Sequence, residues 1–250
     1  MARTHTINAD ASLGYDQGLR TYFLNIMLIM GVGLAITGGV SWWISHSEGM
    51  MHTLFNLQTY VEDGETKTRP GMSGWFIAAS LIQLGMVWRL SWGAGTASRY
   101  GPRVTYGIFF AYAALSGVTI APVLYAYTDA SVATVFFLAA ATFGCCALFG
   151  HTTKIDLRPL GTFFLMALIG LLLAMVVNIF LRSPAMDFMV SIVGVLLFAA
   201  LTAFDMQKLE QLYDEMGTSD GLIVYGALTL YLDFINMFLF LLRLFGARRD

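Results

Sequence analysis

The sequence predicts an all-α polytopic membrane protein. Its 250 residues are 57% hydrophobic and only 12% charged, and the mean hydropathy is +0.68, which is far more apolar than a soluble domain of this length. Seven apolar segments are long enough to cross a bilayer as helices. The strict alternation of a membrane β-barrel is absent, so each spanning backbone must satisfy its own hydrogen bonds as a helix.

One membrane domain, residues 1–250, holds all seven predicted helices. They lie at 21–44, 73–92, 104–127, 130–150, 158–181, 187–206 and 222–245. The longest connection, 45–72, is polar and acidic and is expected to be an exposed loop. The third and fourth helices are joined by so short a turn that they must be antiparallel neighbours, and so must the fifth and sixth. The connection 207–221 is expected to be an acidic loop.

The charge distribution limits the orientation and the partners. The net charge is −2, and no basic run exceeds Arg248-Arg249, so no nucleic-acid partner is expected. If the N-terminus is cytoplasmic, that side carries eight of the fourteen Lys and Arg residues, which favours this orientation. The C-terminal side stays open, because a last segment that crosses only halfway would bring the tail back. No cleaved signal is expected at the polar N-terminus.

The last apolar segment carries the candidate site. Asp233 lies near the middle of this segment, and an ionisable group there is costly unless it faces a protein interior or a water-filled cavity. Tyr225, Thr229 and Asn236 fall on the same helical stripe as Asp233. A helix with one polar seam needs neighbours around that seam, so we predict a central last helix wrapped by the other six, with these side chains lining a cavity or pore.

A second aspartate, Asp205, ends the sixth segment, with Thr202 three residues before it on the same face. Two carboxylates on consecutive antiparallel helices can share one proton, because two like charges a few ångströms apart do not both ionise readily. One geometric objection stands: Asp205 is predicted near the membrane boundary, whereas Asp233 is nearer mid-depth. Contact then requires a deeper sixth helix, a tilted or offset seventh helix, or a bridging water.

Other motifs favour packing over chemistry. Ser73, within Gly-Met-Ser-Gly, matches a motif of intramembrane serine proteases, but all four histidines lie outside the apolar segments, so no buried base is available to activate it. Ser116, on the polar face of the third helix, fits cavity lining about as well as helix packing. Cys145 and Cys146 are adjacent and are expected to be small packing residues.

Three stretches, LYLDFINMFLFLLR, AFDMQKL and FAYAALSGVTIAPVL, closely resemble the Bax inhibitor-1 family, and the similarity extends from about residue 20 to the end. The resemblance implies a seven-helix, pH-sensitive calcium leak channel of internal or bacterial membranes. It also implies that Asp205 and Asp233 are the family's paired aspartates. An arginine after the second helix is expected to partner them: Arg99 by spacing, with Arg89 as its rival, because the 45–72 loop is longer than in compact bacterial members.

The resulting hypothesis is a proton-gated, calcium-permeable channel in a bacterial inner membrane. No catalysis and no cofactor are expected, and Asp205 and Asp233 are expected to hold calcium only transiently, since calcium prefers six to eight oxygen ligands. The expected partners are the lipid bilayer, calcium and protons, and the protein is expected to be a monomer. The alternative is a membrane-embedded regulatory protein that modulates partner proteins without conducting ions.

Overall fold

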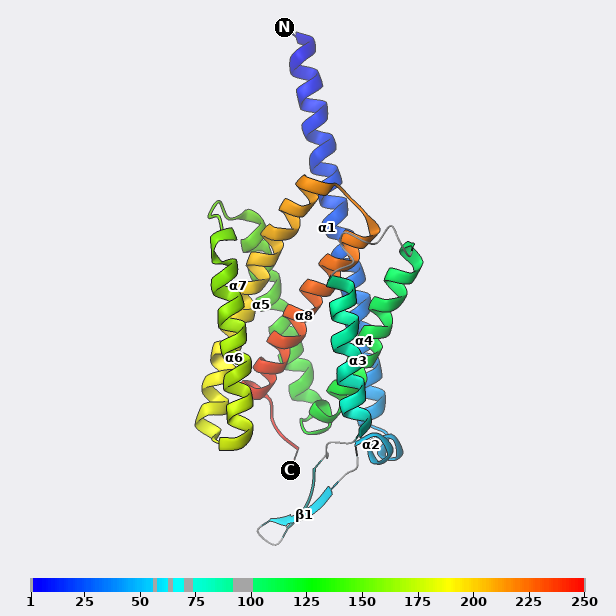
Figure 1. The fold of residues 1–250 in the computed structure, drawn as a ribbon, viewed down its shortest axis with the longest axis vertical. Coiled ribbons are helices and arrows are strands. Elements are labelled where there is room, and N and C mark those ends of the chain that lie inside the picture. Colours follow the sequence, from blue (N-terminus) through cyan, green and yellow to red (C-terminus); the bar gives the residue numbers. More distant parts are fainter. Residues whose placement is uncertain (1, 56–57, 63–64, 70–73, 92–100, 250) are drawn as a thin grey trace.

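The fold is a bundle of long helices in a computed structural model (Figure 1). The structure describes the backbone over residues 2–55, 58–62, 65–69, 74–91 and 101–249, and side chains over 15–55, 74–91 and 101–249. In chain order, the elements are α1 (Ala2–Ser45), α2 (Glu48–Phe55), β1 (Gln58–Glu62), β2 (Glu65–Arg69), α3 (Gly74–Ser91), α4 (Pro102–Tyr125), α5 (Asp129–Thr152), the 3₁₀ turn η3 (Arg158–Leu160), α6 (Gly161–Leu181), α7 (Pro184–Met216) and α8 (Asp220–Phe245).

Six helices among the described residues are long and apolar enough to cross a membrane, which confirms the all-α polytopic class. They are α1, α4, α5, α6, α7 and α8, and each overlaps a predicted segment. The remaining predicted segment, 73–92, coincides with α3, a helix of 18 residues that does not meet the same threshold. The count of seven spans therefore stays a prediction.

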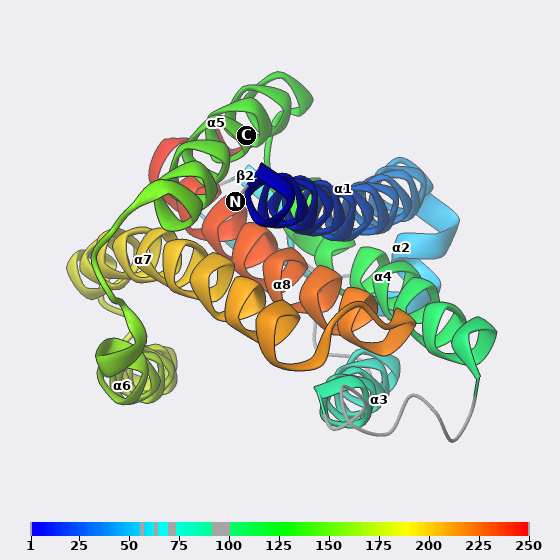
Figure 2. The same ribbon diagram turned by 90° about the horizontal axis from the view of Figure 1, so that it is seen from above.

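The last helix is the most buried of the six. In α8, 67% of the most apolar stretch is buried, against 11% in α6. Helices α1, α3, α4, α5 and α7 all pack against α8, whereas α6 packs mainly on α7. Viewed along the bundle, α8 lies between α7 and α4 while α6 stands to the outside (Figure 2). Wrapping of the last helix by all six others thus stays a prediction.

Two predicted loops contain helix. In the stretch 45–72, α2 buries Met51 and Phe55 against Ile44 and Ala121, and β1 pairs antiparallel with β2. The prediction of a loop was wrong here because α2 spans only eight residues, too few to stand out in a membrane-length window. The prediction of a loop over 207–221 was also wrong, since α7 continues to Met216 and ends before Gly217, whose φ of 69° is left-handed.

That second error has a clear physical reason. Residues 207–216 are mostly Gln, Lys, Leu and Glu. The mean hydropathy of this stretch is too low for a membrane span, but these residues are strong helix formers. Helix α7 is consequently 33 residues long, longer than the roughly 20 residues needed to span hydrocarbon.

The two chain ends lie at opposite ends of the bundle (Figure 1), and α8 is one continuous helix, which argues against a half-crossing last segment.

Close contact between α5 and α7 depends on a glycine. A Cβ at Gly150 would lie 2.7 Å from Ala203 Cα and 2.9 Å from the Ala203 carbonyl carbon. Because these are backbone atoms, the helices must separate to admit a methyl group. We expect Gly150→Ala to destabilise the fold by about 1–3 kcal/mol, the usual cost of overpacking, and to lower the thermal unfolding temperature in detergent.

Gly144, six residues earlier on α5, is the matched control, since a Cβ there meets nothing within 4 Å. Gly144→Ala should leave the unfolding temperature unchanged or raise it slightly, because alanine favours helix. Equal stability of the two variants would contradict the close α5–α7 packing.

Candidate functional site

The two predicted aspartates meet between α7 and α8. Asp205 is 7% exposed and Asp233 is 4% exposed, and their carboxyl groups lie within hydrogen-bonding reach of each other. Helices α7 and α8 are joined by the short connection 217–219 and pack closely along their lengths. From the sequence, these carboxyl groups could meet only with a deeper sixth helix, a tilted or offset seventh helix, or a bridging water. The structure places them together.

Because α7 continues past the predicted end of the sixth helix, Asp205 and Asp233 no longer lie at different depths. Asp205 lies eleven residues before Met216, and Asp233 lies thirteen residues after Asp220. At about 1.5 Å per residue, these positions are roughly 16 Å and 20 Å from the shared α7–α8 end. The two carboxyl groups are therefore at similar depths, which the predicted end of the sixth helix near residue 206 did not allow.

The hydrogen bonding of the pair depends on its protonation. Among the described residues, no donor reaches the buried Oδ2 atom of Asp233. Asp205 is in reach, but a carboxylate only accepts hydrogen bonds, so two carboxyl groups bond to each other only when one carries a proton. A single shared proton satisfies this geometry, whereas two ionised groups at this separation repel each other.

Lys208 brings a positive charge to the pair. It lies one turn after Asp205 on α7, and its charge acts on both carboxyl groups. Its Nζ atom donates a hydrogen bond of 3.0 Å to Tyr225 Oη and lies 5.7 Å from the centroid of the Tyr225 ring. Tyr225, a residue of the predicted polar stripe, thus holds the ammonium group beside the aspartates.

Lys208 is a site residue that was not predicted from the sequence. The available signal was the Asp205-x-x-Lys208 spacing, because residues three apart are neighbours on one helix face. The predicted end of the helix at residue 206 placed Lys208 in a loop and hid this signal.

The other predicted stripe residues form local bonds. Thr229 Oγ1 donates to the Tyr225 carbonyl at 3.0 Å, and Asn236 Nδ2 donates to the Leu232 carbonyl at 2.7 Å. Thr202, fully buried, likewise donates to the Phe198 carbonyl at 2.8 Å. Each of these bonds stays within its own helix, and the role of the three residues in lining a pore stays a prediction.

Ser116 belongs to a separate polar cluster. Its Oγ accepts a hydrogen bond of 2.9 Å from Gln83 Nε2, and on the same helix the Ala113 carbonyl accepts a hydrogen bond of 2.8 Å from Thr37 Oγ1. Tyr231 Oη is also 2.7 Å from Thr37 Oγ1. The cluster ties α1, α3, α4 and α8 together, so the described contacts of Ser116 are with packing partners and not with the aspartate pair.

The choice between the two predicted arginine partners stays open. Arg99 and Ser73 lie outside the described residues. Arg89 is partly buried in the last turn of α3.

For calcium, the described residues include no group of three or more His, Cys, Asp or Glu side chains that could hold a metal ion.

A polar cavity of about 370 Å³ lies at the ends of α5 and α7, near the start of α6. His151 Nδ1 is 3.3 Å from Glu210 Oε2 at this cavity. Arg158 donates hydrogen bonds of 2.7 Å and 2.9 Å to the two carboxylate oxygens of Asp156. These bonds hold the pKa of Asp156 below its usual range, so this carboxylate stays charged at neutral pH.

Comparison with known proteins gives a consistent match over most of the chain. Residues 19–250 match the family model described as inhibitor of apoptosis-promoting Bax1. The inner membrane protein YbhL of Escherichia coli K12 is 38% identical over 237 residues, covering 93% of this chain and 94% of YbhL. An uncharacterized protein of Caulobacter vibrioides is 36% identical over 251 residues, with 98% and 96% covered, and one of Deinococcus radiodurans is 38% identical over 236 residues, with 93% and 92% covered.

Proposed function

The chain belongs to the Bax inhibitor-1 family, and on that premise we propose that it is a pH-sensitive, calcium-permeable leak channel gated by Asp205 and Asp233. It is a multi-pass membrane protein, and its similarity to an inner membrane protein of Escherichia coli points to the bacterial inner membrane. The observation that carries the proposal is the meeting of two buried carboxyl groups between α7 and α8.

The gate follows from the charge states of this pair. With one shared proton, Asp205 and Asp233 hold α7 and α8 together and close the path. At higher pH the shared proton is lost, and the two carboxylates repel each other. The helices then separate, and the exposed carboxylates attract a cation. At lower pH both groups are neutral, and that attraction is weakened.

Calcium passes such a site without being stored there. Calcium is a hard cation that takes six to eight oxygen ligands, and the pair supplies at most four carboxylate oxygens. Water must complete the coordination shell, so binding at the pair is brief. A brief stay suits a leak pathway, because conduction requires a site weak enough for the ion to leave.

We place the gate nearer the cytoplasm. Helix α3 is proposed as the seventh span, which sets the N-terminus and the α7–α8 connection on one side of the membrane. That side carries the larger share of Lys and Arg, as cytoplasmic sides do. Asp205 and Asp233 are then reached from the cytoplasmic end of the bundle, and cytoplasmic pH sets their charge.

Reconstitution tests the proposal. Purified protein is inserted into vesicles loaded with a calcium indicator, and calcium entry is measured over a series of pH values. We expect entry that rises severalfold as the pair loses its proton. Protein-free vesicles give the background, and a calcium ionophore shows that the indicator responds at every pH. Entry no greater than background at every pH would contradict the channel and leave the non-conducting regulatory role.

A further inference from the structure

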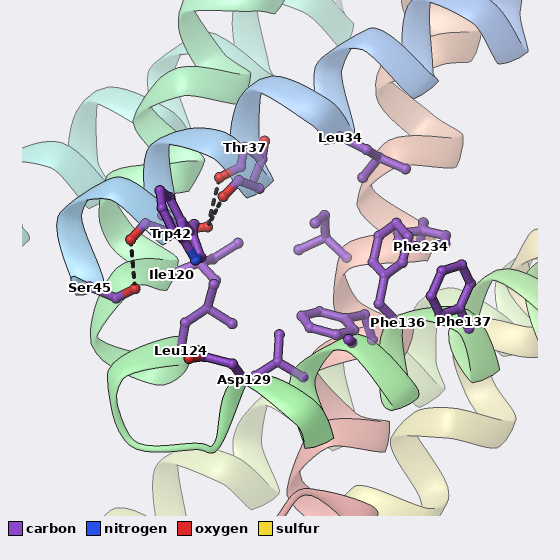
Figure 3. A pocket seen from close by; sticks show the side chains of 16 residues that line it. Leu34, Thr37, Trp42, Ser45, Ile120, Leu124, Asp129, Phe136, Phe137 and Phe234 are labelled. Atoms are coloured by element: carbon purple, nitrogen blue, oxygen red, sulfur yellow. Dashed lines mark hydrogen bonds between the residues drawn. The ribbon is translucent and has the colours of Figure 1, made fainter. Parts of the chain in front are cut away.

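A cavity unrelated to the aspartate pair lies between α1, α4, α5 and α8. Its volume is about 380 Å³, within the roughly 300–1,000 Å³ typical of ligand pockets. Ile120 and Leu124 of α4 line one side, while Phe136 of α5 and Phe234 of α8 line the other (Figure 3). The interior is therefore suited to a hydrocarbon chain.

The few hydroxyl groups on the wall do not call for a polar ligand. Thr37 Oγ1 bonds the Ala113 carbonyl at 2.8 Å and Tyr231 Oη at 2.7 Å. Ser41 and Ser45 donate to carbonyls of their own helix at 2.7 Å and 3.0 Å. With these bonds made, α1 presents mainly carbon atoms to the cavity.

One end of the cavity carries opposite charges. Asp129, the first residue of α5, lines the cavity. Its Oδ1 accepts a hydrogen bond of 2.8 Å from Arg249 Nη2, and its Oδ2 is 3.2 Å from His46 Nε2. The Asp129 side chain is 61% exposed, so a carboxylate and a guanidinium are presented side by side to a head group.

The depth of the cavity matches one leaflet of a bilayer. On α1 the lining runs from Ser45, the last residue of the helix, back to Leu34. Eleven residues of helix rise about 16 Å, close to half of the roughly 30 Å hydrocarbon thickness. The charged end therefore lies at the level of lipid head groups, and the apolar interior extends toward the bilayer centre.

The cavity is accessible from the side of the bundle. Trp42 is 59% exposed and Phe137 is 72% exposed, and both line it. In a membrane-spanning bundle these side chains face lipid, and tryptophan is enriched at the head-group level. An acyl chain can enter from the surrounding leaflet without crossing a polar surface.

We propose that this cavity binds one zwitterionic phospholipid from the leaflet on the C-terminal side. One acyl chain lies between α1 and α5, the phosphate contacts Arg249, and the head-group amine contacts Asp129. A zwitterion complements this pair of charges, whereas a purely anionic head group would be repelled by the Asp129 carboxylate. The proposal does not depend on ion conduction.

The test counts bound lipids on the full-length protein in detergent by native mass spectrometry. Phosphatidylethanolamine and phosphatidylglycerol with identical acyl chains are added separately. We expect one tightly held phosphatidylethanolamine, bound at least about tenfold more tightly than phosphatidylglycerol, which corresponds to roughly 1.4 kcal/mol. Equal binding of the two lipids would overturn the assignment of the head group.

Variants with larger side chains that fill the cavity give a second test of the lipid site. Gly38 lines the cavity, and a Cβ there meets nothing within 4 Å. Gly38→Leu should abolish the tight site, and Ala133→Phe should do the same from the α5 wall if the first variant does not fold. Gly39→Leu is the matched control: it is the next residue on α1, its Cβ also meets nothing within 4 Å, and it does not line the cavity. Retention of the lipid by both filling variants, or its loss in Gly39→Leu, would overturn the site.

The charge of the head-group site can be changed separately. Asp129→Asn leaves Arg249 without its carboxylate partner and makes the site net positive. The preference should then move from phosphatidylethanolamine toward phosphatidylglycerol, while one acyl chain still binds. An unchanged preference would overturn the contact between Asp129 and the amine.

Discussion

Replacing either aspartate of the pair by asparagine should flatten the pH response of calcium entry. Asparagine keeps the size of the side chain and much of its hydrogen bonding, but it neither titrates nor repels its neighbour. Asp205→Asn and Asp233→Asn should each remove most of the dependence on pH. Because the two groups titrate as one coupled unit, the double variant should add little to either single variant.

Asp187→Asn is the control for the pair. Asp187 is partly buried near the start of the same helix, α7, far from Asp205 along the chain. This variant should keep the pH response of the wild type in the same vesicles. A double aspartate variant with a wild-type response would show that another group senses pH.

Removing the positive charge of Lys208 should move the midpoint of the response to higher pH. The ammonium group acts on both carboxyl groups and favours their charged forms. Without it, a higher pH is needed to remove the shared proton. A nearby opposite charge commonly moves a carboxyl titration by about one to three pH units, so Lys208→Met should shift the midpoint by an amount of this order while leaving a response to pH.

Two variants separate this effect from simple loss of a lysine. Lys154→Met removes a lysine that lines the polar cavity at the ends of α5 and α7 and should leave the midpoint unchanged. Tyr225→Phe removes the hydroxyl group that accepts the Lys208 hydrogen bond and should shift the midpoint in the same direction by less. A Lys208→Met midpoint at or below that of the wild type would contradict the role of this charge.

The last helix was predictable because its signal is local. A carboxylate in the middle of a long apolar stretch, with Tyr225, Thr229 and Asn236 at helical spacing, indicates a buried polar seam whatever the neighbouring helices are. The structure bears out the burial of Asp233. Which helices cover this seam depends on packing between distant segments, and the placement of α6 outside α7 could not be read from periodicity.

The sequence could suggest the meeting of Asp205 with Asp233 but could not establish it. The meeting depends on how far α7 extends beyond the apolar stretch, because that length sets the offset between two antiparallel helices. Hydropathy indicates which residues lie in the hydrocarbon core of the bilayer. Helix propensity and the left-handed Gly217 decide where the helix itself ends. The same difference concealed Lys208, which belongs to the site only if α7 continues.

The cavity lined by Trp42 could not be predicted from the sequence, for a related reason. Its walls come from four helices, and each contributes ordinary apolar residues that would equally suit a packed core. Only the arrangement in space leaves room between Phe136 and Ile120. The charged end combines residues 46, 129 and 249, which no local pattern connects.

The shared proton is the central claim, and infrared titration of the purified protein tests it most directly. A protonated carboxyl group has a carbonyl stretch distinct from that of a carboxylate. The wild type should show one such group disappearing over the same pH range in which calcium entry rises. This transition should move in pH in each of Asp205→Asn and Asp233→Asn, because one carboxyl group remains, and it should be absent from the double variant. A wild-type spectrum with no buried protonated carboxyl group, or a transition that persists unchanged in the double variant, would contradict the shared proton.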